Sequence, residues 1–101
     1  MKRLNDLLDD VRVLDIENNN NPVVSALTYD SRTVESGSCF FAVRGTQSDG
    51  HNYISSAIEC GASVIVCEEM PTTHIEHISY VMVEDSNIAM ATMAAAIYDH
   101  P

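Results

Sequence analysis

Two short apolar runs separated by a polar cluster constrain this 101-residue chain more than any other feature. One run is residues 26–29 (ALTY), in the predicted strand Val23–Asp30, and the other is residues 39–43 (CFFAV). Both are bounded by turn-forming residues, which is typical of buried β-strands. After Val43 the chain breaks again at a polar, Gly-containing segment, and a helical pattern begins near His51. Polar residues therefore follow two successive strands, which is where α/β folds bind ligands.

The rest of the chain alternates between helical and strand patterns. An i, i+3, i+4, i+7 stripe near the N-terminus predicts a short amphipathic helix. Residues 13–16 fit either a small strand or the tail of that helix, and residues 18–22 (NNNNP) predict a loop. This alternation predicts a single small α/β domain with a mainly parallel central sheet flanked by helices. The stripe is Leu4, Leu7, Leu8 and Val11, and the strands are 23–30, 39–43, 62–67 and 80–83.

Two longer helices carry recognisable start and stop signals. Ser48 or Asp49 is predicted to cap the first helix, and Gly61 is placed for a left-handed C-terminal cap. A short connection from this helix to the next strand predicts a right-handed parallel crossover. Ser86 is predicted to cap the second helix, and residues 74–78 are ambiguous, with a helical turn as one interpretation. The predicted buried faces are Tyr53, Ile54, Ala57 and Ile58 in the first helix, and Ala89, Met93, Ala96 and Ile97 in the second.

The acidic balance of the chain excludes some classes of partner. Its formal net charge is −10, with only five Lys and Arg residues. Nucleic acid and anionic membrane surfaces both attract a basic face, so we expect neither as a partner. A small anionic ligand stays possible, because backbone N–H groups at a helix N-terminus can hold a phosphate without a basic surface.

The cysteines and the hydropathy pattern predict a cytoplasmic protein. Cys39, Cys60 and Cys67 are odd in number and lie in or beside apolar runs, which predicts buried free thiols in a reducing compartment. No apolar run approaches the roughly 20 residues needed to span a bilayer. The N-terminal segment turns acidic too soon for a signal peptide.

The best candidate site from the residues alone combines Ser31 with Thr46, Gln47 and Ser48. Hydroxyls and an amide at strand ends can bond a pyrimidine edge or phosphate oxygens, and the helix N-terminus near Gly50 favours negative charge. The alternative is that these residues only terminate strands and cap a helix. No catalytic residue is assigned, since no paired carboxylates, triad or reactive cysteine pattern is present.

Other residues leave their interpretation open. Gly45 and Gly50 either permit close approach of a ligand or supply positive φ, and neither a P-loop nor a G-x-G-x-x-G pattern is present. His51 is either a base or ligand contact beside Asp49, or a hydrogen-bonded structural histidine. The His74–His77 pair flanks Glu76 without a second ligand pair, so we expect a solvated turn and no metal.

Several motifs in fixed order resemble the N-terminal domain of the Mur ligases, the ATP-dependent amino-acid ligases that build the peptidoglycan stem peptide. The resemblance covers nearly the whole chain and is greatest to the ligases that add the third stem-peptide residue. The motifs are Asp30-Ser31-Arg32, Gly37, Phe40-Phe41-Ala42-Val43-x-Gly45, Asp49-Gly50-His51-x-Tyr53-Ile54, Ala57 and Gly61-Ala62.

The resemblance implies a substrate-binding domain for the UDP-MurNAc part of UDP-MurNAc-L-Ala-D-Glu. Matched positions place Tyr29 and Ser31 at the uridine nucleotide, and Thr46, Gln47 and Ser48 on the loop that holds uracil and diphosphate. Asp49, Gly50 and His51 are possible additions to this site. The family's ATP loop and magnesium ligands do not match any residues here, so ATP and Mg²⁺ are expected only for the full-length enzyme.

We therefore expect the chain to be a substrate-binding domain, residues 1–101, whose partners are the central ATP-binding and C-terminal domains of the same enzyme. On its own it is expected to be inactive. One alternative is the same domain of the D-alanyl-D-alanine-adding Mur ligase. Another is a non-catalytic interaction module with this fold. The amino acid added, the oligomeric state and the role of Arg44 are not predicted.

Overall fold

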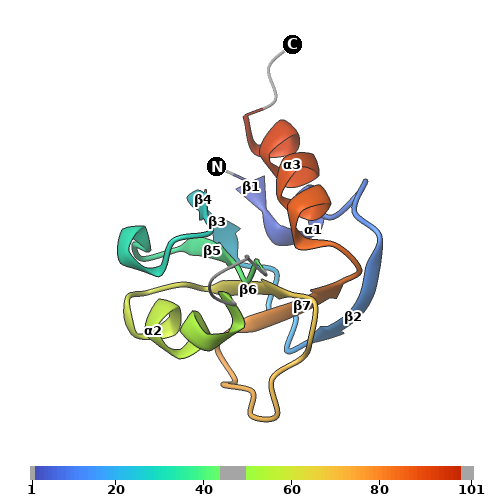
Figure 1. Ribbon diagram of the computed structural model, residues 1–101. Helices are drawn as coiled ribbons and strands as arrows, with labels where there is room; N and C mark the ends of the chain where they lie inside the picture. Colours follow the sequence, from blue (N-terminus) through green and yellow to red (C-terminus); the bar gives the residue numbers. More distant parts are fainter. Residues whose placement is uncertain (1, 44–49, 99–101) are drawn as a thin grey trace.

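The computed structural model describes residues 2–43 and 50–98 and has a five-stranded sheet with helices on both faces (Figure 1). A separate two-stranded sheet pairs the N-terminal residues with a later segment. In chain order the elements are β1 Lys2–Arg3, α1 Leu4–Leu7, β2 Val13–Glu17, β3 Val23–Val24, β4 Ala26–Thr28, the 3₁₀ turn η1 Ser31–Thr33, β5 Ser38–Phe41, the 3₁₀ turn η2 Gly50–Tyr53, α2 Ile54–Glu59, β6 Val64–Cys67, β7 Ser79–Val83 and α3 Ser86–Ile97.

The main sheet has the order β2-β7-β6-β5-β4. The neighbours β4, β5, β6 and β7 pair in parallel, and β2 joins the edge of β7 antiparallel. The prediction of a small α/β domain with a mainly parallel sheet is therefore confirmed. Residues 13–16, which the pattern left open, belong to the antiparallel edge strand.

Both faces of the sheet are buried, as the apolar strand runs predict. Alternate residues of β5 point to opposite sides: Cys39 and Phe41 pack in one core cluster with α1 and α3, and Phe40 packs in the other with α2. Figure 1 shows α1 and α3 together on one side of the sheet and α2 on the other. In the described part of the chain, no helix is long and apolar enough to cross a membrane.

The predicted strand Val23–Asp30 is wrong as a single strand. Val23 and Val24 pair antiparallel with β1, and only residues 26–28 pair with β5. Ser25 interrupts the strand because its backbone N–H donates to the Gly37 carbonyl at 3.0 Å and its hydroxyl donates to the Ser36 carbonyl at 3.2 Å. The strand ends at Thr28, whose hydroxyl accepts from the Asp30 N–H at 3.0 Å and turns the chain.

Three details of the predicted helices and cysteines are also wrong. Tyr53 is exposed, because it ends the η2 turn before α2 begins at Ile54. The cap of α3 is Asp85, with Ser86 as the first helical residue. Cys60 is exposed, since it follows the last residue of α2, whereas Cys39 and Cys67 are buried.

The turn after α2 needs a glycine for two reasons. Gly61 has φ +114°, a conformation that side chains with a Cβ rarely adopt. A Cβ at Gly61 would also lie 2.9 Å from the Ser36 Cα, because the two loops touch here and the Gly37 N–H donates to the Gly61 carbonyl at 3.0 Å. The predicted C-terminal cap is thus confirmed, and it also joins α2 to the loop that follows η1.

Candidate functional site

The carboxyl ends of the parallel strands lie at one edge of the sheet. In the register of β4 and β5, Thr28 stands beside Phe40, so residues 29–31 lie beside the end of β5. The chain returns to this edge at Gly50, where η2 begins. The structure therefore places residues 29–31 and Gly50, which are described parts of the predicted site, at the same edge of the sheet.

A tightly bonded turn presents the first of these regions. The Asp30 carboxylate caps η1 by accepting from the Arg32 backbone N–H at 2.9 Å. The same carboxylate accepts from the Arg32 guanidinium at 3.1 Å and 3.0 Å, a two-pronged ion pair. These hydrogen bonds lower the pKa of Asp30 and raise the pKa of Arg32. The Asp-Ser-Arg motif is thus a self-supporting turn.

Within this turn, Ser31 and Tyr29 are available to a ligand. Ser31 is half-buried, and among the described residues its hydroxyl makes no hydrogen bond. The Tyr29 side chain is 65% exposed. A free hydroxyl beside an exposed aromatic ring can bond one edge of a base or sugar and contact its flat face. Both predicted residues therefore have the access that their proposed role needs.

Gly50 is required by the protein's own backbone. Its N–H donates to the Val43 carbonyl at 2.8 Å, which ties the start of η2 to the end of β5. A Cβ at Gly50 would stand 2.6 Å from the Val43 backbone nitrogen. Gly50 does not have a positive φ, and its lack of a Cβ permits direct backbone contact with Val43. Its role toward a ligand stays a prediction.

His51 is a structural histidine. Its Nε2 atom accepts from the Glu68 N–H at 3.0 Å and from the Glu69 N–H at 3.2 Å. These bonds hold η2 against the turn that follows β6. His51 therefore makes the hydrogen bonds expected of a structural histidine, and its role toward a ligand stays a prediction.

A second group of polar residues at this edge is fully engaged in joining elements. The Glu68 carboxylate accepts from the Ser86 N–H at 2.8 Å, and the Ser86 hydroxyl donates to the Ala42 carbonyl at 3.0 Å. The Asp85 carboxylate takes the next two N–H groups of α3. The sequence analysis missed this corner. An aspartate directly before a helical run is a capping signal that could have located Asp85, but no local signal pairs Glu68 with a helix eighteen residues away.

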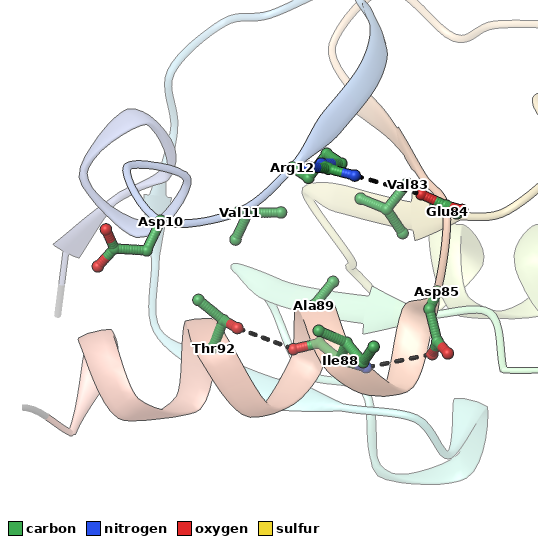
Figure 2. Close-up of a pocket in the computed structure, with 9 residues that line it drawn as sticks. All are labelled: Asp10, Val11, Arg12, Val83, Glu84, Asp85, Ile88, Ala89 and Thr92. Atoms are coloured by element: carbon green, nitrogen blue, oxygen red, sulfur yellow. Dashed lines mark hydrogen bonds and ion pairs between the residues drawn. The ribbon is translucent and has the colours of Figure 1, made fainter.

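Beside this corner lies a pocket of about 560 Å³, shown in Figure 2. Val11, Val83 and Ala89 line its apolar part. Its polar rim carries three carboxylates and one guanidinium. The guanidinium of Arg12 and the carboxylate of Glu84 form a long ion pair, with 3.9 Å between nitrogen and oxygen. Such a rim repels a diphosphate, and the first N–H groups of α3 are already bonded. The rim residues are Asp10, Arg12, Glu84 and Asp85.

A second hollow of about 460 Å³ lies on the α2 side, between residues such as Ile54, Ile58 and Met70. Neither Tyr29 nor Ser31 lines either hollow, so their surface is open. Four other predicted site residues, Thr46, Gln47, Ser48 and Asp49, lie outside the described residues, as does Gly45. The structure therefore describes the predicted site only in part.

The described residues contain no group of three or more His, Cys, Asp or Glu side chains placed to hold a metal ion. The His74 ring packs edge-on against Tyr80, with centroids 4.9 Å apart. Burial raises the pKa of the Cys39 thiol and raises that of Cys67 to about 12. Both cysteines are therefore protonated and unreactive near neutral pH.

Comparison with known proteins identifies the family of this arrangement. The profile described as "Mur ligase family, catalytic domain" matches residues 23–100. The chain is 39% identical over 98 residues to a UDP-N-acetylmuramoyl-L-alanyl-D-glutamate–2,6-diaminopimelate ligase of Bacteroides thetaiotaomicron, covering 97% of this chain and 20% of the relative. It is 45% identical over 78 residues to a UDP-N-acetylmuramyl-tripeptide synthetase of Treponema pallidum, covering 77% and 14%.

Solved structures agree on the fold. A MurF of Acinetobacter baumannii superposes with a TM-score of 0.78 at 23% identity, over 94% of this chain and 20% of that chain. A MurF ligase of Thermotoga maritima, solved with ADP, gives a TM-score of 0.61 at 31% identity, over 70% and 16%. The chain thus spans about a fifth of the length of the curated relatives that it matches over nearly its whole length.

Proposed function

The chain belongs to the Mur ligase family, and we propose that it is the domain that holds the UDP-MurNAc part of the substrate in a cytoplasmic peptidoglycan ligase. The substrate is UDP-MurNAc-L-Ala-D-Glu, and the enzyme adds the third residue of the stem peptide. The fold is that of the small α/β N-terminal domain of this family, with its parallel sheet and flanking helices.

One observation carries this proposal: the exposed Tyr29, and Ser31, whose hydroxyl has no hydrogen-bond partner among the described residues, both follow the carboxyl end of β4. At the same edge, Glu68, Asp85 and Ser86 make hydrogen bonds within the protein. A uridine nucleotide offers a flat base and several acceptors, which suits an aromatic ring beside a hydroxyl donor. The proposed site continues over Thr46, Gln47 and Ser48.

The choice of the third-residue ligase rests on the names of the curated relatives. The two relatives reported above are a diaminopimelate ligase and a tripeptide synthetase. The solved neighbours are MurF proteins, one of them titled a D-alanyl-D-alanyl ligase. Their likeness favours the D-alanyl-D-alanine-adding ligase as the second candidate. In either case the domain binds the nucleotide end of a UDP-MurNAc peptide.

We propose that this chain itself binds neither ATP nor Mg²⁺. The sequence has no G-x-x-x-x-G-K-[ST] motif, and the described residues offer no cluster of metal ligands. We propose that both bind in parts of the enzyme corresponding to the other four fifths of the relatives. The role of this chain is to bind and orient substrate, and by itself it is expected to show neither ATP hydrolysis nor ligation.

A chemical-shift titration of the labelled chain tests the proposal. UDP-MurNAc-L-Ala-D-Glu is the ligand, and UMP is the smaller comparison. We expect shifts at Tyr29, Ser31 and Gly50, with Ser56 on the outer surface of α2 as an unaffected reference. No shifts at these residues with millimolar ligand would contradict the proposal. Shifts confined to the acidic pocket of Figure 2 would contradict the placement of the site.

A further inference from the structure

Helix α3 has a composition that is unusual for a helix on a protein surface. Residues 86–98 (SNIAMATMAAAIY) contain no charged side chain, although 20% of the whole chain is charged. One side of α3 faces the core through Ala89 and Met93. A helix on a solvated surface normally carries polar or charged residues on its other side. The outward side of α3 carries no charged residue, and Asn87 is its exposed polar residue.

The outward side forms one continuous apolar face, which we call the α3 face: Ile88, Ala91, Ala95 and Tyr98. Steps of three, four and three residues place these side chains along one stripe. Ile88 is 66% exposed and Tyr98 is 60% exposed, and both alanines are exposed. The stripe pairs two large apolar side chains with two small ones between them, a surface into which ridges of another element can pack.

The acidic pocket adjoins the N-terminal end of the α3 face. Ile88 belongs to both, and Figure 2 shows its side chain beside Ala89 and Thr92 along the pocket wall. Three carboxylates with one guanidinium at the rim leave this end negatively charged. A partner surface that covers the α3 face would therefore be complementary if it carried an apolar stripe and, near the pocket, a lysine or arginine.

We propose that the α3 face and the acidic pocket are the docking surface for the remainder of a Mur ligase chain, which presents an apolar surface with a basic residue at the pocket end. This inference rests on the proposed function. The matched region is only 20% of the Bacteroides relative and 20% of the Acinetobacter structure. Members of this family thus carry a large additional body of protein, which can cover an apolar face that this chain leaves exposed.

The rate at which a maleimide reagent labels single thiols tests this surface. The variant Ala95→Cys places a thiol in the centre of the α3 face, and Ser56→Cys is the matched control on exposed α2, across the sheet. Each is made in the Cys60→Ser background, while buried Cys39 and Cys67 do not compete. Each is measured in this chain alone and in a chimera in which this chain replaces the matched region of the Bacteroides thetaiotaomicron ligase.

We expect labelling at position 95 to be about tenfold slower in the chimera than in the chain alone, with the rate at position 56 unchanged. Equal rates at position 95 in the two contexts, or equal slowing at both positions, would overturn the proposal. Slow labelling in the chain alone that speeds up on dilution would overturn it too, because a second copy would then cover the face.

The same chimera separates this inference from the proposed function. Shielding of the α3 face requires no nucleotide, and nucleotide binding is read independently by adding UDP-MurNAc-L-Ala-D-Glu. A shielded face without nucleotide binding would contradict the proposed function alone. Nucleotide binding with an unshielded face would contradict the docking surface alone.

Discussion

The two halves of the carboxyl edge of the sheet use similar polar residues in opposite ways. After β4, the Asp30–Arg32 pair supports a turn that contains Ser31 and follows Tyr29, and neither side chain has a hydrogen-bond partner in the described part of the chain. After β6 and β7, Glu68, Asp85 and Ser86 all bond to α3 or to β5. We call the first the open half and the second the closed half.

The difference shows that a polar side chain at a strand end is not by itself a ligand contact. In the closed half such side chains satisfy the free N–H groups of a helix start and a buried carbonyl, which would otherwise cost stability. In the open half the Asp30 turn supplies hydrogen bonds to its own backbone. The Ser31 hydroxyl is left without a hydrogen-bond partner among the described residues. The following variants test this division, from the largest expected effect to the smallest.

Gly50→Ala should do the most damage, because Gly50 is in direct backbone contact with the end of β5. The added Cβ would stand 2.6 Å from the Val43 nitrogen and 2.8 Å from its carbonyl oxygen. Displacing η2 also disturbs the His51 bonds to the turn after β6. We expect unfolding free energy to fall by about 3 kcal/mol, measured by denaturant titration, and nucleotide binding to be lost. Ser56→Ala is the control, and a stable, binding-competent Gly50→Ala variant would show that the backbone contact is dispensable.

Ser86→Ala should weaken the closed half alone. The buried hydroxyl donates to the Ala42 carbonyl at 3.0 Å, and its removal leaves that carbonyl without this partner. We expect a loss of about 2 kcal/mol in unfolding free energy, with nucleotide affinity unchanged. Ser55→Ala, at an exposed position of α2, controls for the serine-to-alanine change. A marked loss of affinity in folded Ser86→Ala protein would mean that the two halves are coupled.

Ser31→Ala should weaken the open half alone. Since the hydroxyl has no bond within the described residues, its removal should leave thermal stability unchanged. Affinity for UDP-MurNAc-L-Ala-D-Glu should fall by about 1 kcal/mol, roughly fivefold, for one lost hydrogen bond. Isothermal titration of this variant and of Ser56→Ala makes the comparison. Equal affinities in the two variants would remove Ser31 from the site.

The smallest effect is expected from the pH dependence of the Asp30 turn. Its hydrogen bonds to Arg32 hold the pKa of folded Asp30 below the ordinary value of 3.8. The stability from this pair is therefore complete above 3.8 and is lost as pH falls through the lower pKa of the folded state. The Tm difference between wild type and Asp30→Asn should be greatest near neutral pH and should shrink as the pH falls below 3.8. A difference that persists unchanged in acid would show that the carboxylate charge contributes nothing.

Much of the fold was predictable because its signals are local. The apolar runs of β5, β6 and β7 and the glycine after α2 were all placed correctly, since each is a property of a short segment. The strand before η1 was predicted too long. Its division at Ser25 depends on a loop eleven residues away, at Ser36, and on pairing with the chain start.

The candidate site divides in the same manner. Ser31 and Tyr29 were predicted, and the structure leaves them accessible, though nucleotide binding itself stays a prediction. His51 was left open from sequence, because its role depends on the two N–H groups that it meets at residues 68 and 69. Glu68 was missed for the same reason, and Ser86 was given the capping role that belongs to Asp85.

The sequence by itself determined the segments that form β5, β6, β7 and the main helices, the glycine turn after α2, and the family that the motifs resemble. Only the tertiary structure decided which polar side chains form hydrogen bonds within the protein and which stay available to a ligand. Ser31 and Ser86 each stand at the start of a helical turn, and nothing local separates them. The Ser86 hydroxyl donates to the Ala42 carbonyl, 44 residues away, and the Ser31 hydroxyl does not. Whether a hydroxyl is available to a ligand depends on whether the folded chain brings an acceptor within hydrogen-bond distance. The acceptor here is distant in sequence, so local sequence does not reveal it.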